Sequence, residues 1–258
     1  MPDSRNFPRQ QPGGADWFMQ APLLTWLLCA ASVVTTGLFW LAQQPGHTIA
    51  YSSLGPVAAP DIWGGQYWGL VTGVFLHGGL LHLLFNMIWL YQLGGMLERS
   101  LNTLTYLVFV VAAAAIGSGC ELAFDGTTGI GMSGVVYAIF GLMWAGRGRY
   151  PQWGAYATND NLRLFLGWGI FCFVATYFGW MSIANWAHAG GLLFGLSVGW
   201  LFLSARPHRW LWAIPLAGLI ALTVLSVTWM PWSPSWKLWK SARQSVSLTV
   251  PGADNTMP

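Results

Sequence analysis

Charged residues are scarce in this sequence. Asp, Glu, Lys and Arg make up only 7% of the 258 residues, whereas hydrophobic residues make up 55%. Soluble domains are typically about one quarter charged, so this composition excludes an ordinary soluble domain and indicates a membrane protein. The net charge is only +3 and the basic residues are scattered along the chain. Without a basic patch to neutralise phosphates, nucleic acid is not an expected partner.

Cysteine and the usual metal-binding motifs are also scarce. The three cysteines, Cys29, Cys120 and Cys172, lie in separate apolar runs with no CxxC spacing, so we expect them to pack as small apolar side chains. There is no HExxH motif and no pair of aspartates within an apolar run, which argues against zinc and aspartyl intramembrane proteases. We therefore expect no metal and no other cofactor.

Long apolar runs are what the sequence does contain, and about 20 such residues can cross a bilayer as a helix. Seven runs of this kind lie near residues 21–42, 70–95, 103–123, 132–147, 164–181, 184–204 and 210–230. They predict an all-α membrane protein, a polytopic helical bundle. We divide the chain into a short polar tail (1–20), a six-helix core (21–205), a seventh transmembrane helix (206–232) and a polar C-terminal tail (233–258). The first apolar run starts too late and is too long for a cleaved signal peptide, so we expect it to be retained.

Basic residues near the span ends predict the orientation, because cytoplasmic loops are enriched in them. Those flanking the first six runs are Arg5, Arg9, Arg99, Arg147, Arg149, Arg163, Arg206 and Arg209. All eight fall on one side of the predicted bundle, and the opposite loops contain none. The N-terminus is therefore expected in the cytoplasm. Seven spans would place the C-terminal tail outside although it carries three basic residues, so the seventh run fits this rule least well.

Few polar groups lie within the runs, and ionisable ones inside a membrane are usually functional. No Asp, Glu, Lys or Arg lies in the middle of a run. Glu98 and Glu121 lie near run ends, where we expect a helix end or loop to solvate them. The remaining candidates include three histidines, His77, His82 and His188. They could in principle hold a metal, but no carboxylate or thiolate lies beside them, so this reading is disfavoured.

Ser133 opens the fourth run, in GMSGVVYAIFG. Unpaired backbone N–H groups and the positive end of the helix dipole favour negative charge at such a position. With the predicted orientation, Ser133 and His188 lie at a similar depth, and a neutral imidazole can act as the base that a serine nucleophile needs. No carboxylate is available to orient His188, so a dyad is favoured over a triad.

His82 and Asn86 are four residues apart in HLLFN and lie on one face of the predicted second helix. We expect them, together with Ser133 itself, to stabilise an oxyanion. His77 lies five residues before His82 and is expected on a different helix face with a structural role. The bland alternative is that all these side chains act in helix packing and interhelical hydrogen bonding.

The residues now described resemble the rhomboid family of intramembrane serine proteases. The resemblance rests on YWGLVTGVFLHGGLLHLLFNMIWLYQLGGMLE, GMSGVVYAIFG and NWAHAGGLLFG, which appear in the family's order between Trp68 and Gly199. It implies that Ser133 is the nucleophile and His188 the general base. It also implies that Tyr137 stacks on the base, that Gly131 and Gly134 support the site, and that Glu98 is structural.

The resemblance further implies a membrane-embedded loop between the first two spans. In that loop Trp68 is followed by Gly69 where the family usually has arginine. The implied function is cleavage of transmembrane-helix substrates near the outer side of the bilayer, through an acyl-enzyme, in a bacterial inner membrane. Movement of the fifth helix and of the loop from Met181 to Trp186 would admit the substrate. The alternatives are an inactive rhomboid-like protein that binds membrane helices and, with less support, a transporter.

Overall fold

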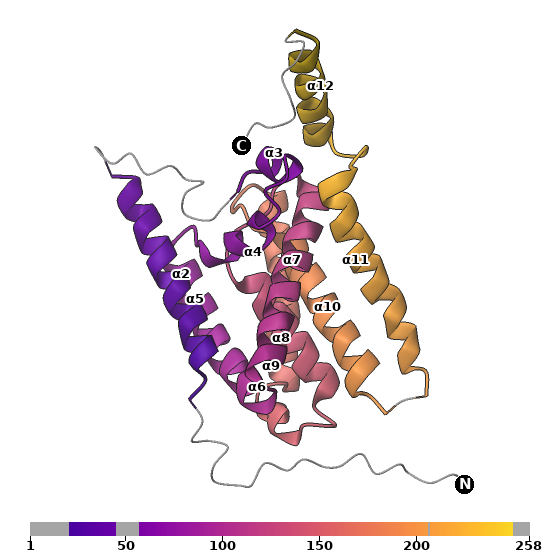
Figure 1. The fold of residues 1–258 in the computed structure, drawn as a ribbon. Coiled ribbons are helices and arrows are strands. Elements are labelled where there is room, and N and C mark those ends of the chain that lie inside the picture. The colour runs from indigo at the N-terminus through magenta and orange to yellow at the C-terminus, as the bar shows by residue number, and fades with distance from the viewer. Residues whose placement is uncertain (1–20, 45–56, 206, 250–258) are drawn as a thin grey trace.

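The computed structural model describes residues 21–44, 57–205 and 207–249, and these residues form helices but no strand (Figure 1). The longer α-helices are α2 (Leu23–Ala42), α5 (Leu80–Trp89), α7 (Thr103–Asp125), α8 (Ser133–Gly146), α9 (Asn159–Tyr177), α10 (Asn185–Leu203), α11 (Ala213–Thr228) and α12 (Pro234–Thr249). The shorter helical elements are α3 (Ala59–Trp63), α4 (Gly69–Thr72), η2 (Gly73–Phe75), η3 (Leu90–Gly94), α6 (Gly95–Ser100), η4 (Pro151–Ala155) and η5 (Arg209–Trp212). The fold confirms the predicted polytopic helical bundle. The predicted N-terminal tail, residues 1–20, lies outside the described residues.

Five helical stretches within the described ranges are long and apolar enough to cross a bilayer. They are Leu23–Ala42, Leu80–Ser100, Thr103–Asp125, Asn185–Leu203 and Arg209–Thr228. The last of these is the seventh predicted span. Helix α9 is also long, with 19 residues, but begins with the polar residues Asn159 and Asp160.

Helix α8 is the exception in length and in position. It has only 14 residues and is buried along almost its whole length, with α7 and α10 packed against it. At about 1.5 Å per residue it cannot cross a hydrocarbon core about 30 Å thick. One end of α8 therefore lies below the membrane surface.

The prediction that the second span covers residues 70–95 was wrong. The span runs instead from Leu80 to Ser100, through the π-helical segment η3. Extended backbone at Leu76 and Gly79 separates it from α4 and η2. Apolar residues before Leu80, such as Val74, are buried within the protein. Hydropathy does not distinguish such burial from exposure to lipid, so the predicted span began too early.

Glycines bring α8 and α10 into backbone contact. A Cβ atom added at Gly191 would overlap the carbonyl of Gly134, and one added at Gly195 would overlap the carbonyl of Ala138. Small residues such as Gly191 and Gly195 allow this approach between membrane helices. The contact sets the relative position of the two helices.

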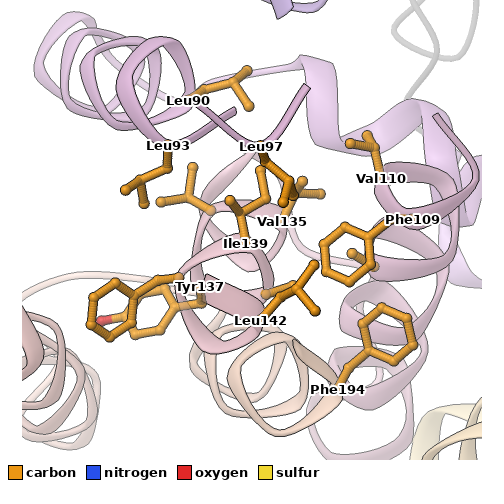
Figure 2. Packing of buried hydrophobic residues seen from close by; sticks show 14 of the residues in the cluster. Leu90, Leu93, Leu97, Phe109, Val110, Val135, Tyr137, Ile139, Leu142 and Phe194 are labelled. Atoms are coloured by element: carbon orange, nitrogen blue, oxygen red, sulfur yellow. The ribbon is translucent and has the colours of Figure 1, made fainter. Parts of the chain in front are cut away.

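The main core surrounds α8. Figure 2 shows Val135, Ile139 and Leu142 of this helix among side chains from the second span and α7. Phe109 of α7 stacks on Phe194 of α10, with 5.4 Å between ring centroids. Helix α8 is thus fixed on several sides by packing.

The predicted polar C-terminal tail contains a helix, α12, which lies at the same end of the bundle as α3 (Figure 1). Trp236 of α12 is buried in a second core cluster with Ile62 and Trp63 of α3. Trp63 also donates a hydrogen bond of 3.0 Å from Nε1 to the carbonyl of Ser226 in α11. Tryptophan side chains thus join the C-terminal helices to the loop between the first two spans.

We expect Gly195→Ala to destabilise the protein, because its methyl group would meet the backbone of α8. Overpacking of this kind costs about 1 to 3 kcal/mol, and thermal unfolding in detergent would measure it. Gly218→Ala in α11 is the matched control, since no atom lies within 4 Å of a Cβ added there. Equal unfolding temperatures for the two variants would show that the α8–α10 contact is not tight.

Candidate active site

Ser133 and His188 meet between α8 and α10. Ser133 is the first residue of α8, and His188 lies near the start of α10. The distance between Ser133 Oγ and His188 Nε2 is 2.7 Å, which is hydrogen-bond distance. The imidazole is 6% exposed and its Nδ1 atom is buried without a hydrogen-bond partner. No carboxylate therefore orients this ring through Nδ1.

Tyr137 lies one turn after Ser133 and stacks on the imidazole of His188. The ring centroids are 4.7 Å apart and the planes differ by 15°. The Tyr137 hydroxyl donates a hydrogen bond of 2.8 Å to the carbonyl of Phe165 in α9. The tyrosine ring thus lies against the face of the histidine, as the resemblance implied.

The loop before Ser133 depends on glycine. Gly129 and Gly131 have φ angles of +63° and +100°, values that L side chains rarely adopt. A Cβ atom added at Gly131 would lie 2.6 Å from Nε2 of His82. Gly134, just after the serine, packs against the carbonyl of Ala187. Gly131 and Gly134 therefore allow close contacts on either side of Ser133.

His82 and Asn86 lie on α5 at the side of this loop. The His82 ring is placed against Gly131, two residues before Ser133. The Asn86 amide donates a hydrogen bond of 2.8 Å to the His82 carbonyl, within its own helix. His82 is thus already beside the loop, whereas the Asn86 amide must turn away from its own helix before it can donate elsewhere.

The prediction that His77 lies on a helix face was wrong. It lies in the loop that precedes α5. It is fully buried, and its Nε2 atom accepts the backbone N–H of Met132 at 3.3 Å. Its own backbone N–H donates to the Thr36 hydroxyl in α2 at 3.1 Å. His77 therefore joins α2 to the loop that leads into Ser133, in line with the structural role expected for it.

A narrow cavity lies next to Ser133. Its lining includes Ser118 of α7, Gly131 and Ala187. No group of three or more His, Cys, Asp or Glu side chains within the described ranges has an arrangement that could hold a metal ion. All three cysteines are free thiols. The arrangement at Ser133 therefore offers a hydroxyl, an imidazole and backbone N–H groups for chemistry.

Comparison with known proteins identifies the family. The Rhomboid domain model matches residues 64–205. The Rhomboid protease GlpG of Salmonella newport (strain SL254) is 33% identical over 211 residues, which cover 78% of this chain and 70% of the relative. The Rhomboid protease GlpG of Salmonella paratyphi A is 32% identical over the same length. The chain belongs to the rhomboid family.

This rhomboid is an integral membrane protein and an intramembrane serine protease. Family membership implies transmembrane-helix substrates within a lipid bilayer. The non-enzyme alternatives, an inactive rhomboid-like protein and a transporter, are not supported, because the matched relatives are named proteases.

The departure at Gly69 has a local explanation in this rhomboid. A Cβ atom added at Gly69 would lie 2.5 Å from Cβ of Val57, so the loop folds back on itself too closely for a side chain. Trp68 beside it is exposed. The space that a side chain at position 69 would need is occupied here by the side chains of Val57 and Ile62.

The sequence predicts that a helix end or loop solvates both glutamates; helix ends do so here, although both side chains are buried. Glu98 is 7% and Glu121 is 3% exposed. The Glu98 carboxylate accepts the backbone N–H groups of Leu24 and Thr25 at 2.9 and 2.8 Å. Glu121 accepts the N–H of Ala187 at 2.9 Å. Both carboxylates therefore accept hydrogen bonds from the first turns of other helices, α2 for Glu98 and α10 for Glu121.

We expect His77→Ala to destabilise this rhomboid, because the N–H of Met132 loses its acceptor in a buried place. The cost of such an orphaned donor is about 1 to 3 kcal/mol, which thermal unfolding would detect. His208→Ala is the control, since His208 is exposed. If both variants unfold like the wild type, the contact between His77 and Met132 does not support the loop.

Proposed function

We propose that this rhomboid cleaves transmembrane helices with a Ser133/His188 dyad through an acyl-enzyme intermediate. The observation that carries the proposal is the distance of 2.7 Å between Ser133 Oγ and His188 Nε2. A histidine at this distance can take the hydroxyl proton as the serine attacks. Because the Nδ1 atom has no partner, the ring depends on Tyr137 and on its helix for orientation.

The first half of the reaction forms the acyl-enzyme. Ser133 Oγ attacks the carbonyl carbon of the scissile peptide, and its proton moves to His188 Nε2. The carbonyl oxygen becomes an oxyanion. When the C–N bond breaks, His188 returns the proton to the leaving amine. In the second half, water attacks the acyl carbon, gives a proton to His188 and displaces Ser133, which takes the proton back.

We propose three groups as donors to the oxyanion. The backbone N–H of Ser133 lies in the first turn of α8, where N–H groups have no partner within the helix. His82 lies against Gly131, in the loop before the serine. The Asn86 amide becomes a donor when it exchanges its bond to the His82 carbonyl for the oxyanion. Such donors stabilise the transition state because charge develops where they point.

The depth of Ser133 supports cleavage within the membrane, near its outer side. Helix α8 is too short to span, and the described basic residues near the ends of the first six spans lie at the end of the bundle opposite Ser133. They are Arg99, Arg147, Arg149, Arg163 and Arg209. From the positive-inside rule we infer that the N-terminus lies in the cytoplasm of a bacterium and that Ser133 lies toward the outer side. The substrate helix enters from the lipid beside α9, which exposes many large apolar side chains.

Purified protein should cleave a single-span model substrate, and Ser133→Ala or His188→Asn should abolish the cleavage while the thermal unfolding curve stays that of a folded protein. A fluorophosphonate probe should label Ser133 and no other residue, as mass spectrometry would show. Full activity in either variant would disprove the dyad.

Asn86→Ala should slow turnover by about ten- to a thousandfold, the range expected when one oxyanion donor is lost. The measured quantity is kcat on the same substrate. Gln92→Ala, in the same span but in η3, is a matched control that should keep wild-type turnover. An Asn86 variant with unchanged kcat would remove this residue from the oxyanion site.

A further inference from the structure

Glu121 is a buried carboxylate that the proposed reaction does not use. Its Oε2 atom accepts the backbone N–H of Ala187 at 2.9 Å, and the backbone N–H of Trp186 also interacts with the carboxylate. Ala187 is the third residue of α10 and directly precedes His188. Glu121 therefore contacts the first turn of the helix that carries the proposed base.

This first turn of α10 has no cap from its own sequence. The residue at the N-cap position is Ala184, which provides no side-chain hydrogen bond, although the first N–H groups of a helix need external acceptors. The first hydrogen bond within the helix runs from the N–H of His188 to the carbonyl of Ala184 and is 3.3 Å long. Glu121 supplies from α7 the acceptor that α10 lacks.

The position of the His188 imidazole depends closely on this turn. Its Nδ1 atom has no hydrogen-bond partner, so apart from packing only the Tyr137 ring and the Ser133 hydroxyl hold it. Ala187, which Glu121 binds, also packs with its carbonyl against Gly134, the residue after Ser133. A shift of the first turn would therefore move His188 relative to the serine.

A second side chain fixes the same turn, but from a different helix. The Asn185 amide donates a hydrogen bond of 2.8 Å to the Thr176 hydroxyl near the end of α9. Helix α9 has only a few buried side chains, among them Phe165 and Cys172, whereas α7 is buried over much of its length. If α9 moves to admit a substrate, the contact with Thr176 is lost and the contact with Glu121 remains.

We propose that Glu121 is a positioning residue, which holds the first turn of α10 so that His188 stays within hydrogen-bond distance of Ser133 while substrate enters. The inference rests on the proposed dyad. It differs from a purely structural role because it predicts a loss in the rate of the chemical step in molecules that are folded.

The test uses the full-length protein and its Glu121→Ala, Glu121→Gln and Asp125→Asn variants. The readouts are the rate of Ser133 labelling by a fluorophosphonate, kcat and KM on the model substrate, and thermal unfolding.

In Glu121→Ala the labelling rate and kcat should fall roughly ten- to a hundredfold, with KM nearly unchanged, because a small misplacement of a catalytic group has such effects. Glu121→Gln keeps an acceptor oxygen and should recover most of the rate. Asp125→Asn removes an exposed charge one turn further along α7 and should behave like the wild type.

Wild-type labelling and kcat in folded Glu121→Ala protein would overturn the inference, even if the unfolding temperature fell. Should that variant fail to fold, Glu121→Asp carries the test. Its shorter side chain withdraws the carboxylate from Ala187, so a wild-type rate in this variant would overturn the inference as well. Activity that survives Ser133→Ala or His188→Asn would instead disprove the dyad, so the two failures are distinguishable.

Discussion

The backbone contact between α8 and α10 is the constraint on which the site depends. A serine hydroxyl and an imidazole that are 55 residues apart in sequence come within 2.7 Å only because glycines let the two helices touch. Within lipid, the hydrophobic effect does not drive helices together, so their association depends on close van der Waals packing. Each glycine costs helix stability, about 1 kcal/mol relative to alanine in soluble hosts. The close packing of α8 in the bundle offsets that cost, and the same contact that stabilises the fold brings the hydroxyl of Ser133 and the imidazole of His188 together.

A helix that starts inside the membrane leaves backbone N–H groups that lipid cannot satisfy. This rhomboid solves the problem with side chains from other elements. Glu98 accepts two N–H groups at the start of α2, and Glu121 accepts at least one at the start of α10. Ahead of α8, the His77 imidazole accepts the N–H of Met132. The N–H groups of Ser133 and its neighbours lie beyond that contact, at the place where the proposed reaction develops negative charge. The polar groups of the membrane interior thus divide into those that complete helix starts and those that remain for chemistry.

Much of this arrangement could be predicted from the sequence, because lipid demands long apolar helices and tolerates few polar groups. The predicted runs match α2, α7, α10 and the α11 stretch closely, and the pairing of Ser133 with His188 followed from their depth and from the scarcity of other candidates. The start of the second span could not be predicted, since Val74 and Leu76 are as apolar in a buried loop as they would be in lipid. The hydrogen-bond partners of Glu121 and Asn86 could not be predicted either. They are backbone groups, which residue identity does not reveal. The sequence thus indicated which groups are candidates for the chemistry, and the structure shows what holds them in position.

The basic C-terminal segment shows how packing can oppose a charge rule. Lys240 and Arg243 lie at the end of the bundle opposite the cluster of arginines, yet α12 contains tryptophans whose rings they cover, at 4.7 Å for Lys240 over Trp236 and 5.2 Å for Arg243 over Trp239. Trp239 in turn packs on Trp63 of α3, with 5.7 Å between centroids. Val57, two residues before α3, contacts the loop that leads into Ser133, because the Thr128 hydroxyl donates to the carbonyl of Val57 at 3.4 Å. Positive charge is thus accommodated on this side by aromatic faces. The same tryptophans connect α12, through α3, to the loop that leads into Ser133, so the segment after the seventh span is part of the fold around the site.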